Sequence, residues 1–153
     1  MDADELAFLR AVPCFQGLRT EDLLQVHRCA RRREPRAGEI IVHEGQRIAT
    51  LFVVRRGYVC LFTLSAGGTE RMLAVQGPGT TFNEEAACDG GPALATARVL
   101  TADTCIDESP ATLVSHLLTA NPRLAQNIVQ VLAQHIRRLA LLVDERSREG
   151  RVQ

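Results

Sequence analysis

The chain has 153 residues with 18 basic and 18 acidic side chains, so its formal net charge at pH 7 is zero. Hydrophobic residues make up 46% and charged residues 24%, which is the profile of one globular domain with a core of its own. This even charge balance gives no reason to expect nucleic acid or a membrane surface as the direct partner of these residues.

Residues 1–36 are predicted to be helical. A short helix is expected over residues 4–10, and a second begins near Thr20, a residue type that caps helices. The three arginines at 31–33 are expected at the C-terminal end of that second helix, where cations complement the helix dipole. The acidic start of the chain and the lack of any apolar run near 18 residues predict a cytoplasmic protein with no membrane partner.

Residues 37–109 carry the pattern of short strands. Stretches rich in Val, Leu, Ile and Phe alternate with glycine turns at intervals of about ten residues, which predicts an antiparallel β sandwich or barrel. Residues 77–98, GPGTTFNEEAACDGGPALATAR, interrupt this pattern with turns and small side chains. Such a stretch lets another group approach the backbone and offers N–H groups to an anion, although an ordinary connecting loop is the alternative.

Residues 110–149 return to a helical period. A short helix is expected over residues 111–118, followed by a long helix that begins near Leu124. The apolar stripe of the long helix is too extensive for one sheet face to cover, so we expect it to pair with the same helix of a second chain. The alternative is a helix packed wholly on its own barrel. The residues assigned to the homodimer interface are Ile128, Leu132, His135, Ile136, Leu139 and Val143, and residues 150–153 are interpreted as the start of a linker.

Three motifs accompany this order of elements. Residues 41–46 (IVHEGQ) and 51–57 (LFVVRRG) are glycine-punctuated hairpins, and a Gly-Pro-Gly turn at 77–79 precedes Phe82. With these motifs the chain resembles the cyclic-nucleotide-binding, or Crp–Fnr, sensor domain over nearly its whole length. The resemblance implies a mainly β fold with flanking helices: a double-stranded β-helix, or jelly roll, plus a long C-terminal dimerisation helix. It also implies that residues 77–98 are the phosphate-binding cassette.

The cassette departs from the family's pattern where a phosphate would be held. The family's Phe-Gly-Glu and Pro-Arg-x-Ala-Thr appear here as FNEE at 82–85 and PALAT at 92–96. The resemblance gives Glu84 the ribose-binding role, but it places Asn83 at the family's glycine and Ala93 at its phosphate-binding arginine. An arginine–phosphate contact is worth about 1.5–3 kcal/mol, and a buried phosphate without one costs more. We therefore predict that cyclic AMP and cyclic GMP do not bind with useful affinity.

The predicted ligand site still lies in the cassette. Its residues are Phe82, Asn83, Glu84, Glu85, Ala86, Ala93, Ala95, Thr96 and Arg98. Arg98 lies two residues beyond Thr96, on the same face of the expected strand, and is a candidate replacement for the missing cation. The Phe-Asn-Glu variant resembles the branch of Crp–Fnr regulators that answer to other signals, including nitric-oxide-responsive regulators of denitrification, some of which use haem.

No cofactor is firmly predicted from the sequence. Haem needs an axial ligand beside an apolar slot, and His135 on the long helix is the candidate, against the alternative of a solvated helix histidine. The five cysteines have no CxxC spacing, so neither a metal site nor an iron–sulfur cluster is expected. No Ser/His/Asp or Cys/His constellation has the spacing that an enzyme would require.

We therefore expect the effector-sensing and dimerisation domain of a bacterial Crp–Fnr-type transcription regulator. A small-molecule or gas effector would change how two long helices pack, by population shift. DNA would be contacted only through a helix-turn-helix, and none is expected among these residues. Two alternatives stay open: a stand-alone cyclic-nucleotide-binding-like domain that regulates a protein partner, and a haem-based sensor of nitric oxide or carbon monoxide.

Overall fold

The computed structural model describes the backbone of residues 1–152 and the side chains of residues 1–145. The helices are α1 (Ala3–Ala11), the 3₁₀ turn η1 (Pro13–Phe15), α2 (Thr20–Cys29), α3 (Glu84–Asp89), α4 (Ala111–Ala120) and α5 (Pro122–Val152). The strands are β1 (Arg31–Arg33), β2 (Ile40–Val42), β3 (Leu51–Arg56), β4 (Val59–Leu64), β5 (Glu70–Gln76), β6 (Thr81–Phe82), β7 (Thr96–Val99) and β8 (Cys105–Ser109).

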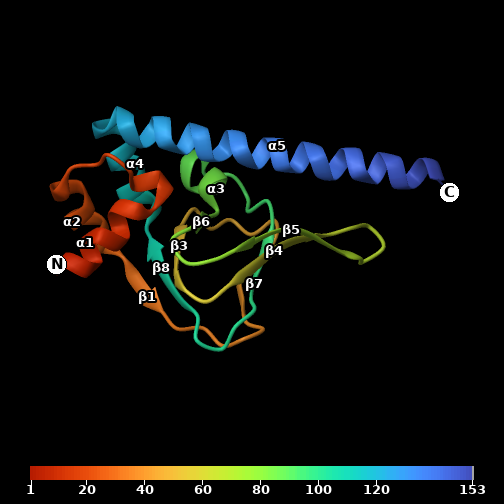
Figure 1. Cartoon of the computed structure of the whole chain (residues 1–153), viewed down its shortest axis with the longest axis horizontal. Coiled ribbons are helices and arrows are strands. Elements are labelled where there is room, and N and C mark those ends of the chain that lie inside the picture. Colours follow the sequence, from red (N-terminus) through yellow and green to blue (C-terminus); the bar gives the residue numbers. More distant parts are fainter. Residues whose placement is uncertain (153) are drawn as a thin grey trace.

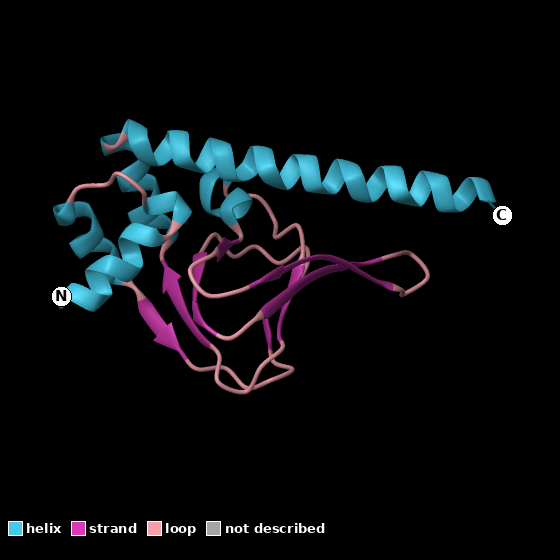
Figure 2. Ribbon diagram, viewed as in Figure 1, coloured by secondary structure: helices cyan, strands magenta, loops and turns pink. Residues whose placement is uncertain are grey.

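The strands form two four-stranded antiparallel sheets, and the helices gather at one end and along one side of them (Figures 1 and 2). One sheet has the order β1-β8-β3-β6 and the other has the order β2-β7-β4-β5. This arrangement confirms the predicted jelly roll with flanking helices. No helix in the described part of the chain is long and apolar enough to cross a membrane.

Strand β3 explains why the core has two parts. Leu51 and Val53 pack against the helices, whereas Phe52 and Val54 face the opposite sheet, and none of the four is more than 1% exposed. Alternate residues of a strand point to opposite faces, so a strand with both faces covered needs a continuous apolar run. The sequence LFVV meets that need, and Phe52 stacks on Phe82 with ring centroids 4.8 Å apart.

The arginines at 31–33 do not end a helix as predicted. They form β1, which pairs with β8, so residues 1–36 are not all helical. Arg32 Nε donates to Asp107 Oδ1 at 3.0 Å, and Arg33 Nη1 donates to Glu108 Oε1 at 3.1 Å. The basic side chains of β1 thus lie opposite the acidic side chains of β8. Opposite charges across a strand pair stabilise that pairing, and the sequence of the first strand alone does not reveal this.

Helix α5 is anchored to the domain at its N-terminal end. Leu124 and Ile128 are buried in the helical part of the core. Asn127 Nδ2 donates to the carbonyl oxygens of Cys14 at 3.0 Å and Gln16 at 2.7 Å. From there α5 runs past α3 and above the β4–β5 hairpin (Figure 1). It continues to Val152, so the helix does not end at residue 149 as predicted, and residue 153 lies outside the described residues.

Candidate functional site

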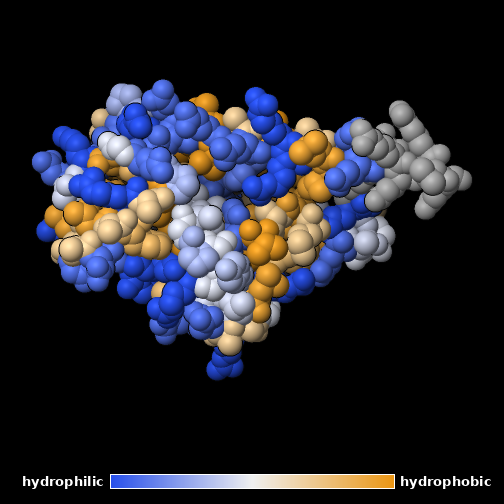
Figure 3. Space-filling model, in the orientation of Figure 1, coloured by the Kyte–Doolittle hydropathy of each residue, from blue (hydrophilic) through white to orange (hydrophobic). Residues whose placement is uncertain are grey.

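A cavity lies between the cassette, the sheet that contains β4 and β5, and α5. Its lining residues are Val42, Leu61, Leu73, Ala74, Phe82, Asn83, Glu84, Glu85, Leu94, Ala95, His135, Arg138 and Leu139. Most of these side chains are apolar, and the four ionisable ones come from α3 and α5. Figure 3 shows hydrophobic side chains on α5 and on the part of the molecule beneath it, on the face in view.

Asn83 sets the direction in which the cassette enters α3. It has φ 69° and ψ 26°, and it is the one non-glycine residue with positive φ in the described chain. Its Nδ2 donates to the carbonyl oxygens of Ile48 and Thr50, both at 2.8 Å. Asparagine tolerates the left-handed region better than most residues, and these two bonds offset the remaining cost. Asparagine can therefore stand in a left-handed turn that suits glycine, with its amide held by the neighbouring backbone.

Glu84 is a buried carboxylate at the floor of the cavity, only 1% exposed. Thr81 Oγ1 donates to Glu84 Oε1 at 2.6 Å, and the thiol of Cys14 in turn lies 3.4 Å from the threonine oxygen. Burial raises the pKa of Glu84, although the Thr81 hydrogen bond and the His135 charge oppose this. Burial also raises the pKa of the Cys14 thiol to about 11.

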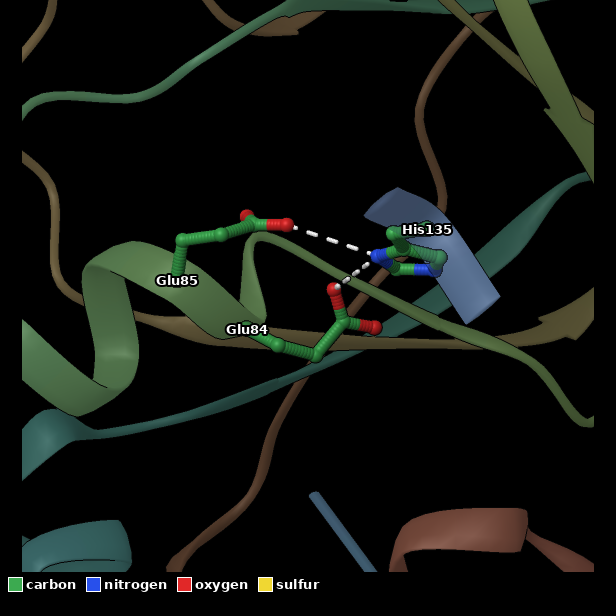
Figure 4. A group of neighbouring side chains, drawn as sticks. All are labelled: Glu84, Glu85 and His135. Atoms are coloured by element: carbon green, nitrogen blue, oxygen red, sulfur yellow. Dashed lines mark hydrogen bonds and ion pairs between the residues drawn. The ribbon is translucent and has the colours of Figure 1, made fainter. Parts of the chain in front are cut away.

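His135 reaches from α5 to the two glutamates at the start of α3 (Figure 4). Its Nδ1 lies 3.4 Å from Glu85 Oε1 and 3.8 Å from Glu84 Oε2. The hydrogen bond to Glu85 raises the pKa of His135, partly opposed by burial. For Glu85, burial is the largest single influence and acts to raise the pKa. The His135 hydrogen bond, a hydrogen bond from the backbone and the His135 charge together outweigh it, so the pKa is lowered. The alternative of a solvated helix histidine is therefore wrong, since only 20% of this side chain is exposed.

Arg98 is not the replacement cation that the sequence suggested. Its Nη1 and Nη2 donate to the two carboxylate oxygens of Glu70 at 2.8 and 3.0 Å, and its guanidinium lies over the Phe62 ring, 4.5 Å from the centroid. These contacts lie outside the cavity, because Ala97 and Val99 face the core between the sheets and Arg98 points to the opposite face of β7. The cation that lines the cavity is Arg138 of α5.

Three other predicted ligand residues also lie outside the cavity lining. Ala93 is packed in the core between the sheets, and Ala86 is buried within α3. The buried Thr96 accepts a hydrogen bond on Oγ1 from the Glu44 N–H at 2.9 Å. The predicted ligand residues that do line the cavity are Phe82, Asn83, Glu84, Glu85 and Ala95.

The sequence prediction missed most of the cavity wall outside the cassette. The missed lining residues outside the cassette are Val42, Leu61, Leu73, Ala74 and Arg138, and Leu94 was missed within it. Strand residues such as Leu61 and Leu73 enter the wall through sheet register, which local sequence does not specify. Arg138 had a detectable signal, because it lies three residues after His135 and so shares its helix face.

The residues predicted to form a dimer interface have different environments. Ile128 is 3% exposed within the core of its own chain, so its assignment to a dimer contact is wrong. Leu132 packs partly against the same core, and His135 and Leu139 line the cavity. Ile136 and Val143 are 67% and 65% exposed. Burial increases toward the N-terminal end of α5 because that end covers the helical core.

Comparison with known proteins gives concordant matches. The sequence model of the family described as "Cyclic nucleotide-binding domain" matches residues 32–113. A curated protein of Thermus thermophilus named "Cyclic AMP receptor protein" is 34% identical over 141 residues, which are 89% of this chain and 62% of the relative. The chain thus spans less than two thirds of that relative's length.

Solved structures give the same fold. The Thermus thermophilus catabolite activator protein superposes with a TM-score of 0.77 at 32% identity, covering 88% of this chain and 63% of that chain. The sensor domain of the transcriptional regulator DNR from Pseudomonas aeruginosa superposes with a TM-score of 0.73 at 22% identity, covering 91% of each chain. At that identity the second match concerns the fold alone.

Proposed function

The chain belongs to the cyclic nucleotide-binding domain family, and from this premise we propose that it is the effector-sensing and dimerisation domain of a bacterial Crp–Fnr-type transcription regulator. One observation carries the proposal: a single cavity has the cassette on one side and α5 on the other. A ligand in it would touch Glu85 on α3 and Arg138 on α5 at once. Such a ligand favours the position of α5 that fits it best, and so it shifts the population of α5 positions.

Dimerisation is supported by the spacing of apolar residues on α5. Val129, Leu132, Ile136, Leu139 and Val143, here called the α5 seam, follow one another at steps of three and four residues. In heptad terms the a positions hold Val or Ile and the d positions hold Leu. This choice favours parallel two-stranded coiled coils. Three seam residues, Val129, Ile136 and Val143, are at least 65% exposed in the single chain.

Sedimentation equilibrium tests this part of the proposal. The expected result is a particle of twice the 16.8 kDa chain mass at micromolar concentrations. A monomer at every concentration measured would refute a dimeric sensor. DNA contact in this account belongs to a helix-turn-helix outside these residues, and the domain itself is cytoplasmic and catalyses no reaction.

The effector in this proposal is a small molecule or gas other than a cyclic nucleotide. Two carboxylates, Glu84 and Glu85, face the cavity with one arginine, Arg138, and one histidine. A cyclic phosphate would meet these carboxylates without the cassette arginine, whose position holds the buried Ala93. The competing function is reception of cyclic AMP, which is favoured by the name of the Thermus thermophilus relative.

Haem sensing is favoured by one observation, that His135 lines the cavity. One feature of the site fits haem poorly. The cavity, at about 70 Å³, is far too small for a porphyrin. We expect no Soret band when haemin is added to the purified domain. A sharp band that moves with nitric oxide or carbon monoxide would select the haem alternative.

A further inference from the structure

Three potential metal ligands converge at the polar end of the cavity. Glu84, Glu85 and His135 each place one ligand atom within 4.8 Å of the other two. His135 Nδ1 is 3.8 Å from Glu84 Oε2 and 3.4 Å from Glu85 Oε1 (Figure 4). Two atoms bound to one first-row metal ion at about 2.0–2.2 Å lie about 3–3.5 Å apart. We propose that these three atoms form a binding site for a divalent transition-metal cation such as Zn²⁺.

The donor set matches this class of cation. One imidazole with two carboxylates suits zinc, cobalt, manganese or iron, whereas magnesium and calcium are bound by oxygen ligands alone. A divalent cation would also neutralise both carboxylates. That matters most for Glu84, because a buried carboxylate without a counter-charge is costly.

Glu84 is the observation that distinguishes this cluster from a chance group of surface residues. Its side chain is 1% exposed, and it carries one oxygen toward the cavity and His135. The other oxygen accepts a hydrogen bond from Thr81 at 2.6 Å. Metal-binding carboxylates are commonly fixed by such a second partner, which holds the ligand in place before the ion arrives.

The surroundings leave room for the ion. The cavity of about 70 Å³ has space for several water molecules, which would complete the coordination. Arg138 also lines the cavity and opposes a second positive charge there. Its side chain is exposed, so solvent screens this repulsion, and the two carboxylates outnumber it.

The site would join two elements that are far apart in the sequence. Glu84 and Glu85 open α3 in the cassette, and His135 lies on α5, 50 residues later. A bound ion would therefore hold α5 against the cassette. The metal site rests only on these three side chains, so it stands whether or not the domain belongs to a transcription regulator.

Calorimetric titration of the chelator-treated protein with ZnCl₂ tests the site. Cys29 and Cys88 are exposed, so the parent protein for this test carries Cys29→Ser and Cys88→Ser, which removes accessible thiolate ligands. We expect one saturable site per chain. Glu85→Gln and His135→Gln should each weaken binding by about tenfold or more, since each removes a direct ligand. The matched control His116→Gln removes an exposed histidine elsewhere and should leave affinity unchanged.

Melting temperatures recorded in chelator show whether each variant folds, and Zn²⁺ should raise that temperature in the parent and the control only. Co²⁺ provides a second readout, because its visible absorption should appear in the parent and vanish in the His135→Gln variant. The proposal is overturned if the parent binds no Zn²⁺ saturably, or if a Glu85→Gln/His135→Gln double variant that folds binds it as tightly as the parent.

Discussion

Replacement of Ile136 by glutamine tests the α5 seam at its centre. Ile136 is 67% exposed in the single chain, so the core of the domain does not depend on it. Glutamine favours helix at least as well as isoleucine, and the change should therefore leave α5 intact. What it removes is apolar surface that a second α5 would bury.

The size of the effect follows from the exposed fraction. Full burial of an isoleucine side chain is worth about 1.5–3 kcal/mol, so two thirds of it is worth about 1–2 kcal/mol in each chain. Both copies lose this contribution in a symmetric dimer. The dissociation constant of the dimer should therefore rise by about 30- to 700-fold, which corresponds to about 2–4 kcal/mol.

Sedimentation equilibrium over a range of concentrations measures that constant. Leu141→Gln is the matched control, because Leu141 is 65% exposed on the same helix but lies five residues from Ile136, off the seam. It should leave the dissociation constant nearly unchanged. Equal weakening by both variants, or no weakening by Ile136→Gln, would refute pairing through the seam.

Three further outcomes follow from local geometry. Asn83→Gly removes two hydrogen bonds but suits the positive φ, so chemical denaturation should show a free energy of unfolding lower by about 1–2 kcal/mol. Asn83→Ala should lower the free energy of unfolding by about 1–2 kcal/mol more, because alanine is strained in the left-handed conformation. In the presence of chelator, the pKa of His135 is raised above its ordinary value of 6.5. The stability that the charged His135 contributes should therefore be complete below pH 6.5 and be lost as the pH rises through the raised pKa. Glu85→Gln should lower the pKa of His135 in an NMR titration. Iodoacetamide at pH 8 should label the exposed Cys29 and Cys88, while the three buried thiols should react only after unfolding, as peptide mass spectrometry can establish.

The fold could be predicted because its signals are local and repeated. Glycine turns separate apolar runs such as the LFVV of β3, and the helical period returns after residue 110. The wrong predictions concern residues whose environment is decided by contacts with distant parts of the chain. The arginines at 31–33 form a strand because acidic residues of β8 lie opposite them. Ile128 is buried because η1 and α4 cover the N-terminal end of α5, and no periodicity on α5 itself reveals that cover.

Only part of the candidate site was predicted, because the rest depends on contacts between segments that are far apart in the sequence. The cassette residues Phe82 to Glu85 are contiguous in the sequence, so one motif finds them. The partnership of Glu85 with His135 spans 50 residues and depends on how α5 crosses α3.

Titration of cyclic AMP into the chelator-treated domain, followed by calorimetry, tests the central claim most directly. We expect no saturable binding up to about 1 mM nucleotide, because Ala93 supplies no cation and Glu85 adds a second carboxylate to the cavity wall. A dissociation constant in the micromolar range would contradict it, and would mean that Arg138 or another cation holds the phosphate.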